Sequence, residues 1–146
     1  MIIRPAEEED IDALLLIEHA CFSHERFHRP YIECLMSLKA ADVLVGTVRD
    51  LVVSSAMVIH YDVQGRSHLL SLATLPSHRG RGLSKRILIR TEEIARRRGS
   101  SSMSLEVRKS NSQAIGLYQG QGYSTIGALT DFFGPKQDAW QMEKPL

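Results

Sequence analysis

One stretch in the middle of the chain restricts its possible folds more than any other. An apolar run at 67–75 is followed by a glycine-containing turn at 76–82, and apolar residues at helical spacing then continue toward Gly99. Residues 102–107 alternate between apolar and polar side chains, as a strand with one buried face does. A strand, a tight turn, a helix and a second strand make a β-α-β unit. We therefore expect two parallel strands joined by a right-handed crossover.

The segments around this unit predict further strands and helices. Two β-branched runs meet at Arg49-Asp50, which indicates an antiparallel hairpin. The expected helices are 10–22, 31–38 and 111–121, and the other expected strands are 43–48, 51–60, 123–126 and 139–144. Strand pairing is then antiparallel at the start and parallel in the middle. The fold class that we predict is α/β (or α+β), with a mixed sheet and helices on both faces.

Length and composition exclude several classes of protein. The 146 residues suit one domain, 1–146, and the net charge of +1 gives no general attraction for nucleic acid or for a membrane surface. Two cysteines, Cys21 and Cys34, are too few for a disulfide framework. No apolar run approaches the ~18 residues of a membrane span, and the N-terminus lacks the pattern of a signal peptide. We therefore expect a cytoplasmic protein with free thiols.

Positive charge is concentrated just after the central turn. Residues 77–98 contain eight Lys or Arg and two Glu. Gly80 and Gly82 let the backbone approach a ligand closely, and the amides that open the following helix attract anions. The cations at this turn are Arg79, Arg81, Lys85 and Arg86. The spacing does not match a P-loop or a dinucleotide fingerprint. The two glycines and the cluster of cations indicate a phosphate or pyrophosphate site. The plain alternative is a solvated helix face.

Two residues after this turn could perform proton transfer. On the strand at 102–107, apolar side chains occupy one face, while Ser104 and Glu106 occupy the other. Ser110 and Asn111 match the start of a helix, and Tyr118 lies on that helix, where a core position is the plainer interpretation. A carboxylate and a phenol beside an anion site could divide a reaction into base and acid roles.

Two motifs in these segments resemble those of one enzyme family. Arg79-Gly80-Arg81-Gly82-Leu83-Ser84 resembles the acetyl-coenzyme A segment of the GNAT family of N-acetyltransferases, which reads Gln/Arg-x-x-Gly-x-Gly/Ala, with Ser84 as the departure. Leu105–Tyr118, followed by Gly122-Tyr123, is similar to a block of the subgroup that acetylates the N-terminal alanine of a ribosomal protein. The likeness spans nearly the whole chain.

The resemblance implies a fold, a co-substrate and a set of site residues. It implies a mostly antiparallel sheet in which a central parallel pair of strands splays around the pantetheine arm of acetyl-coenzyme A. Backbone groups of Leu72, Ala73 and Thr74 would bind that arm. The pyrophosphate would lie against Gly80, Arg81, Gly82, Leu83, Ser84 and Lys85. Asn111 would contact the cofactor, Glu106 would be the general base, and Tyr118 would be the general acid.

The resemblance favours transfer of the acetyl group to a protein N-terminal α-amine in a ternary complex. A small amine, such as an amino acid, a polyamine or an antibiotic, is the alternative acceptor, and a non-enzymatic RNA-binding or anion-binding module is a further alternative. The loops at 22–31 and 128–137 would form the specificity surface, where Glu25 and Asp131 could attract a cation. We expect no nucleic-acid or membrane partner, and a monomer or a homodimer.

A metal site is the remaining candidate. Cys21, His24 and His28 have a spacing like that of metal ligands, but no fourth ligand lies nearby in the sequence. We therefore expect no metal. His60, His68 and His78 are scattered along the chain, and we expect surface or strand positions for them.

Overall fold

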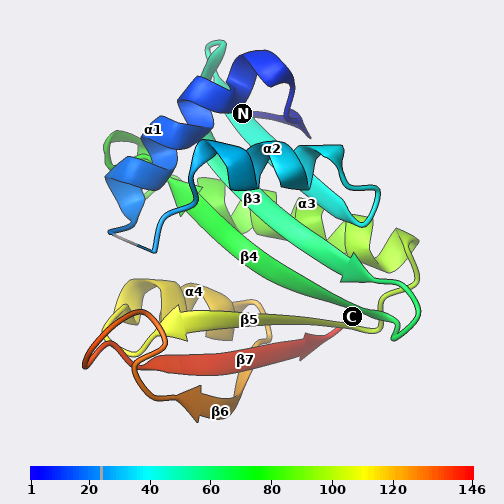
Figure 1. Cartoon of the computed structure of the whole chain (residues 1–146), viewed down its shortest axis with the longest axis vertical. Coiled ribbons are helices and arrows are strands. Elements are labelled where there is room, and N and C mark those ends of the chain that lie inside the picture. Colours follow the sequence, from blue (N-terminus) through cyan, green and yellow to red (C-terminus); the bar gives the residue numbers. More distant parts are fainter. Residues whose placement is uncertain (24) are drawn as a thin grey trace.

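In the computed structural model, which describes residues 1–23 and 25–146, the described residues form a seven-stranded sheet with helices on both faces (Figure 1). The strands are β1 (Ile2–Pro5), β2 (Ala41–Val48), β3 (Leu51–Tyr61), β4 (Arg66–Thr74), β5 (Ser102–Arg108), β6 (Ser124–Leu129) and β7 (Ala139–Pro145). The helices are α1 (Ile11–Cys21), α2 (Arg29–Ser37), α3 (Leu83–Arg97) and α4 (Ser112–Gly120), with short 3-10 turns η1 (Glu8–Asp10) and η2 (Pro76–His78). The predicted mixed α/β fold is confirmed.

The strands lie in the order β1-β2-β3-β4-β5-β7-β6, and every neighbouring pair is antiparallel except β4 and β5. The parallel pair is short, since its register runs from Arg66 opposite Ser102 only as far as His68 opposite Ser104. Beyond that point β4 stays paired with β3 while β5 stays paired with β7. The two central strands therefore diverge toward their carboxyl ends, as the left side of Figure 1 shows. This confirms the expected splayed pair.

Two layers of helices hold the sheet from opposite sides. Apolar residues of α1 and α2 pack with β2 and β3 in one cluster, which includes Leu14, Ile32 and Met57. Helices α3 and α4 pack on the other face, where Leu88 and Tyr118 join Met103 in a second cluster. Alternation along each strand sends side chains to both clusters, so the sheet is buried on both faces at its centre.

The ends of α3 lie where the sequence predicts them. Gly82 precedes the helix with φ +73°, and Gly99 follows it with φ +89°. Both values lie in the left-handed region, which glycine adopts without the steric cost of a Cβ atom. At the C-terminal end, the amide of Gly99 donates to the carbonyl of Arg96, and that of Ser100 donates to the carbonyl of Ala95. These bonds satisfy carbonyl groups that the last turn would otherwise leave open.

The structure also corrects some sequence-based expectations. Strand β1 is not predicted by the sequence, because four residues that include Pro5 give little strand signal, and it forms by pairing with β2. Helix α2 begins at Arg29 rather than at Tyr31, since Pro30 suits the first helical turn. No helix in the described part of the chain is long and apolar enough to cross a lipid bilayer.

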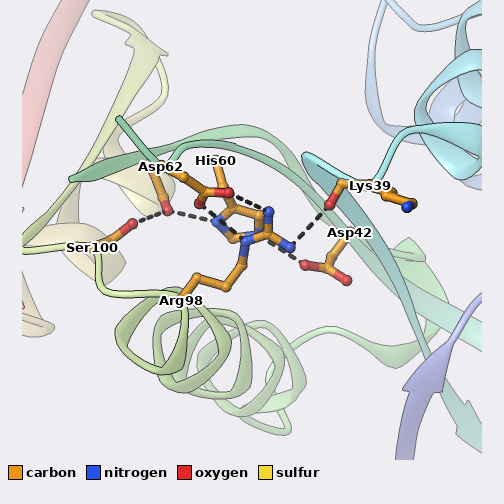
Figure 2. A network of polar contacts seen from close by, with 7 residues as sticks. Lys39, Asp42, His60, Asp62, Arg98 and Ser100 are labelled. Atoms are coloured by element: carbon orange, nitrogen blue, oxygen red, sulfur yellow. Dashed lines mark hydrogen bonds and ion pairs between the residues drawn. The ribbon is translucent and has the colours of Figure 1, made fainter. Parts of the chain in front are cut away.

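His60 occupies a strand position, which is one of the two kinds of position expected for it, and its side chain is buried in β3. It is 2% exposed, and its Nε2 lies 2.8 Å from Oδ2 of Asp42 while its Nδ1 lies 2.6 Å from Oγ of Ser67. Oγ of Ser67 also lies 2.6 Å from Oγ of Ser100, so this hydrogen-bond network links β2, β3 and β4 to the segment that follows α3 (Figure 2). In the same region, the guanidinium of Arg98 donates hydrogen bonds to the carboxylate of Asp62. The order carboxylate, imidazole, hydroxyl is that of a hydrolytic triad, but Ser67 is fully buried, so the network is structural.

A second buried contact joins α3 to β7. Glu92 is 2% exposed and accepts hydrogen bonds from Nζ of Lys144 at 2.7 Å and from Oη of Tyr123 at 2.8 Å. A buried carboxylate is tolerated only when it is paired in this way. Glu92 therefore connects the crossover helix to the last strand of the chain.

Replacing Glu92 with Ala should lower the free energy of unfolding by about 3 kcal/mol, because the partly buried ammonium of Lys144 and the buried phenol of Tyr123 would lose their acceptor. Glu93→Ala is the matched control, since Glu93 contacts Arg90 on the surface, where ion pairs contribute less than about 1 kcal/mol. Urea unfolding at pH 7 measures both values. Equal losses for the two variants would contradict the role assigned to Glu92.

Candidate active site

A cavity of about 470 Å³ opens where β4 and β5 diverge. Its walls contain Leu72 from β4, Glu106 from β5 and Tyr118 from α4. The connection between α1 and α2 contributes Phe27, and the segment before β7 contributes Phe133. Both loops predicted as the specificity surface, 22–31 and 128–137, therefore reach the same cavity as the predicted base and acid.

Glu106 is held by a histidine of the neighbouring strand. Oε2 of Glu106 lies 2.6 Å from Nε2 of His68, and Nδ1 of the same ring lies 2.6 Å from Oγ of Ser104. The two side chains of the pair are 20% and 22% exposed. The apolar residues of β5 face α3 and α4, so alternation turns Ser104 and Glu106 toward the α1 side. The sequence predicts a surface or strand position for His68, and nothing in the local sequence indicates this contact.

Tyr118 approaches the cavity from the opposite face of the sheet. It is 7% exposed, and its ring meets that of Tyr123 edge to face at 5.6 Å between centroids. Burial raises the pKa of Tyr118 above its ordinary value. The phenol therefore keeps its proton over the working pH range, and Oη can act as a hydrogen-bond donor into the cavity.

A smaller cavity of about 380 Å³ adjoins the first and shares Glu106 and His68 with it. Its other walls include Arg66 from β4, Ser104 from β5, and Glu143 from β7. The pair of Glu106 and His68 therefore forms part of the boundary between two openings on the sheet.

The glycine-containing turn has room for a ligand beside its backbone. Gly80 and Gly82 have φ of +79° and +73°, and a Cβ atom at either position would meet no described atom within 4 Å. Among the described residues, no side chain caps the first turn of α3. Arg81 and Lys85 are exposed beside it. A helix start with open amides and exposed cations is suited to an anion.

Other side chains at this turn are already engaged within the protein. Arg79 donates from Nε to the carbonyl of Thr74 at 3.0 Å, and Arg86 donates to the carbonyl of Met1 at 3.2 Å. Of the four cations expected at the site, these two bond to the protein itself. Ser84 is not the helix cap, and its hydroxyl bonds to that of Thr74 at 2.7 Å.

The backbone of β4 beside the cavity is partly satisfied as well. The carbonyl of Ala73 accepts from the hydroxyl of Ser54 at 2.9 Å, and that of Thr74 also accepts from the thiol of Cys21 at 3.4 Å. Leu72 lines the cavity. Asn111 lines it too, and its side chain caps α4 by accepting the amide of Ala114 at 3.1 Å. Of the sequence-predicted site residues, Leu72, Glu106, Asn111 and Tyr118 line the cavity, whereas Ala73, Thr74 and the turn at 80–85 are not among its lining residues.

These features together fit acetyl-coenzyme A. The divergence of β4 and β5 leaves a passage between the two strands, bordered by Leu72 and Glu106. The space beside Gly80 and Gly82 lies at the helix start, where a pyrophosphate would meet open amides. A ligand that combines a long arm with a pyrophosphate matches the passage and the anion site in one molecule.

Arg108 connects the two loops that border the cavity. Its guanidinium forms an ion pair with Glu25 at 2.7 Å, bonds to the side chain of Gln137, and lies 4.8 Å from the ring centroid of Phe133. Burial opposes ionisation of Glu25, but the guanidinium outweighs it and lowers the pKa of the carboxyl. The charge of Glu25 is therefore paired with that of Arg108. Contrary to expectation, it is not available to attract a cation. Asp131 is exposed and accepts the amide of Lys136 at 2.7 Å.

Glu18 is a buried carboxyl group in the wall of the larger cavity. It is 1% exposed, with Oε1 accepting the amide of Phe27 at 3.1 Å and Oε2 accepting the hydroxyl of Ser71 at 3.2 Å. Burial raises the pKa of Glu18 to about 7. Glu18 therefore links the α1–α2 connection to β4 through hydrogen bonds. In the sequence it is visible only as a polar residue on the apolar side of a helix.

The metal hypothesis finds no support among the described residues, where no group of three or more His, Cys, Asp or Glu is placed to hold an ion. His24 lies outside the described residues. Cys21 contacts the carbonyl of Thr74 and the guanidinium of Arg79, and burial raises the pKa of its thiol.

Comparison with known proteins supplies independent information. Residues 4–123 match the model of the acetyltransferase (GNAT) family. The chain is 26% identical to an N-alpha-acetyltransferase of Sulfurisphaera tokodaii over 155 aligned positions, which cover 99% of this chain and 92% of that protein. The crystal structure of a ribosomal-protein-alanine N-acetyltransferase from Brucella melitensis is similar over the full length of both chains, with a TM-score of 0.86 and 26% identity. An uncharacterized protein of Mycobacterium leprae is 30% identical over 112 residues, or 76% of this chain, which spans only 29% of that protein's length.

The pKa of Glu18 makes a prediction about stability and pH. Between the ordinary value of 4.5 and about 7, the folded protein binds more protons at this site than the unfolded chain does. The contribution of Glu18 to stability is therefore intact below about pH 4.5 and falls by about 2–3 kcal/mol as the pH rises to about 7. Glu18→Gln removes this dependence, so the variant should gain stability relative to wild type across that window.

Urea unfolding of wild type and Glu18→Gln from pH 4.5 to 8 measures the difference. Glu8→Gln, at an exposed position of η1, serves as the control and should differ from wild type by the same amount at every pH. A difference between Glu18→Gln and wild type that does not change with pH would show that Glu18 titrates as an ordinary surface carboxyl.

Proposed function

This chain belongs to the acetyltransferase (GNAT) family, and from that premise we propose that it transfers an acetyl group from acetyl-coenzyme A to the α-amine of a protein N-terminus. The family match confirms the resemblance carried by the motifs at 79–84 and 105–118. The observation that carries the proposed chemistry is the shared cavity, in which Glu106 and Tyr118 border the passage between β4 and β5. A base and a hydrogen-bond donor on opposite walls suit attack by an amine on one side and departure of a thiol on the other.

The choice of acceptor rests on two further observations. Two relatives that align over nearly the whole chain are named as an N-alpha-acetyltransferase and a ribosomal-protein-alanine N-acetyltransferase. Glu106 also lines two adjoining cavities, and their combined space suits an acceptor larger than a small amine. Both observations favour a polypeptide terminus.

In the proposed mechanism, acetyl-coenzyme A supplies a thioester carbonyl for the amine to attack and a thiol as the leaving group. The open amides at Gly82 and Leu83 and the side chains of Arg81 and Lys85 bind its pyrophosphate. The walls of the passage at Leu72 and Glu106 hold its arm in position. Binding energy at the turn thus orients the reactive end beside the catalytic groups.

Glu106 prepares the acceptor for attack. An α-amine has a pKa of about 7.7–8.0, so it is mostly protonated at neutral pH and has no lone pair to donate. Oε1 of Glu106 takes the proton from the ammonium group, either directly or through one water molecule. His68 holds the other oxygen of the same carboxylate.

Tyr118 acts at the opposite end of the reacting bond. Its Oη keeps the proton in the resting enzyme, because burial raises the pKa of the phenol. As negative charge develops on the sulfur, the O–H group donates a hydrogen bond and can pass its proton. Glu106 and Tyr118 therefore move protons in complementary directions during one turnover.

The direct experiment is a coenzyme A release assay with purified protein over peptides that differ in their N-terminal residue. Peptides of identical sequence with a blocked N-terminus, together with a set of amino acids, polyamines and aminoglycosides, serve as comparison acceptors. Turnover of the free-amine peptides alone supports the proposal. Turnover of small amines in preference to every peptide would contradict it and would assign the chain to the alternative acceptor class.

Glu106→Gln should lower kcat by about 10²-fold or more at pH 7, because the amide cannot accept the proton of the ammonium group. Tyr118→Phe should also lower kcat by about 10²-fold, since the ring remains in place without its proton donor. Steady-state assays with the best peptide measure both, and calorimetry should show acetyl-coenzyme A binding close to that of wild type. Wild-type turnover in either variant would remove that residue from the mechanism.

Gly82→Ala tests the anion site with Gly99→Ala as its matched control. Both glycines have positive φ and open space where a Cβ atom would lie, so each substitution should cost about 1–2 kcal/mol of stability. Only the Cβ at Gly82 would intrude where the pyrophosphate lies. Calorimetry should therefore show about tenfold weaker acetyl-coenzyme A binding for Gly82→Ala and little change for Gly99→Ala, whereas equal affinities would contradict this placement.

A further inference from the structure

Three side chains that bridge β4 and β5 form a line of hydrogen bonds behind Glu106. Oγ of Ser104 lies 2.6 Å from Nδ1 of His68, and Nε2 of His68 lies 2.6 Å from Oε2 of Glu106. His68 and Ser104 are also opposite one another in the last register position before the two strands diverge. The line therefore begins on rigid, paired backbone and ends on the carboxylate that faces the cavity.

The donors in this line follow from the chemistry of its ends. An ionised carboxylate only accepts hydrogen bonds, so Nε2 of His68 must carry the proton that it shares with Glu106. A neutral imidazole has one N–H group, which leaves Nδ1 with a lone pair. The hydroxyl of Ser104 then donates to Nδ1. The carboxylate of Glu106 thus selects the tautomer of His68, and the hydroxyl of Ser104 satisfies the remaining ring nitrogen.

The same arrangement occurs a second time in this fold, in a purely structural setting. His60 lies between the carboxylate of Asp42 and the hydroxyl of Ser67, and it is closed off from solvent. There the hydrogen bonds connect the three strands β2, β3 and β4 to one another. At His68 the same order of groups lies beside the cavities, since His68 and Glu106 line both of them and Ser104 lines the smaller one, so one oxygen of the carboxylate remains available to a ligand.

We propose that His68 is a positioning residue for Glu106, with Ser104 as the group that holds the other nitrogen of its ring. This inference rests on the proposed function. By donating Nε2–H to Oε2, His68 keeps the carboxylate turned toward the cavity and reserves Oε1 for the proton of the acceptor ammonium. During proton transfer the N–H bond of His68 and the O–H bond of Ser104 stay intact. One proton moves from the amine nitrogen to Oε1.

The test compares His68→Ala with His68→Gln. The side-chain amide of Gln can place an N–H group near the position of Nε2, so it keeps the donor to Glu106 without the ring. We expect His68→Ala to lower kcat for a peptide acceptor at pH 7 by about tenfold or more, with KM for acetyl-coenzyme A within about twofold of wild type. His68→Gln should recover most of that loss. Ser104→Ala should show a smaller loss in kcat, of about two- to fivefold.

Raising the pH separates positioning from general damage. At about pH 9 the acceptor α-amine is largely deprotonated in solution, so the reaction depends less on Glu106. The ratio of wild-type kcat to His68→Ala kcat should therefore shrink between pH 7 and pH 9. The other charged groups on the two cavity walls are unchanged between these enzymes, so they cancel in the ratio; they are Glu18, Glu25, Arg66, Arg108 and Glu143.

His19→Ala is the matched control, because His19 is exposed on α1 and lines neither cavity. It should match wild type at both pH values. The inference is overturned by wild-type kcat in His68→Ala, by an equal loss in His68→Gln, or by a ratio that does not change with pH. If His68→Ala does not fold, Ser104→Ala with the same pH comparison decides the question. Failure of the proposed function itself would appear differently, as full activity in Glu106→Gln.

Discussion

The early end of the pairing between β4 and β5 is the constraint on which the rest of the structure depends. The two strands stay parallel only through His68 and Ser104, and each then continues against its outer neighbour. Backbone groups along the gap must find partners elsewhere, and the carbonyl of Thr74 at the end of β4 accepts from the side chains of Cys21 and Arg79. Helices pack on both faces of the sheet, and the cluster beneath α3 and α4 contains residues of both β4 and β5. The result is an opening through the middle of the sheet.

Charge in this opening is arranged so that one carboxylate remains available. Glu25 is neutralised by Arg108, and the raised pKa of Glu18 allows that buried group to hold a proton near neutral pH. Glu106 contacts an imidazole, which can donate a hydrogen bond without bringing a fixed positive charge. A cationic acceptor amine would therefore meet its strongest attraction at Glu106. The same wall carries the proposed proton transfer.

Much of the fold was predictable from local pattern, and much of the site was not. The β-α-β unit, the stop at Gly99 and the orientation of Glu106 away from the core follow from periodicity and glycine chemistry. His68 and Arg108 gave no local signal, because their partners lie 38 and 83 residues away along the chain, as the numbering of Glu106 and Glu25 shows. Strand β1 escaped prediction for the same reason, since it is supported by pairing with the distant β2.

By itself the sequence determined most of the elements that form, with β1 as an exception, together with the composition of the glycine-containing turn and the family resemblance that the comparisons confirm. These properties depend on backbone preferences and on spacings of a few residues, which are visible in the order of the amino acids. Only the tertiary structure decided where β4 and β5 separate, which cations at the turn bond to the protein itself, and which imidazole meets the carboxylate of Glu106. Those outcomes depend on contacts between distant segments, where packing and burial select one partner among several that the sequence allows.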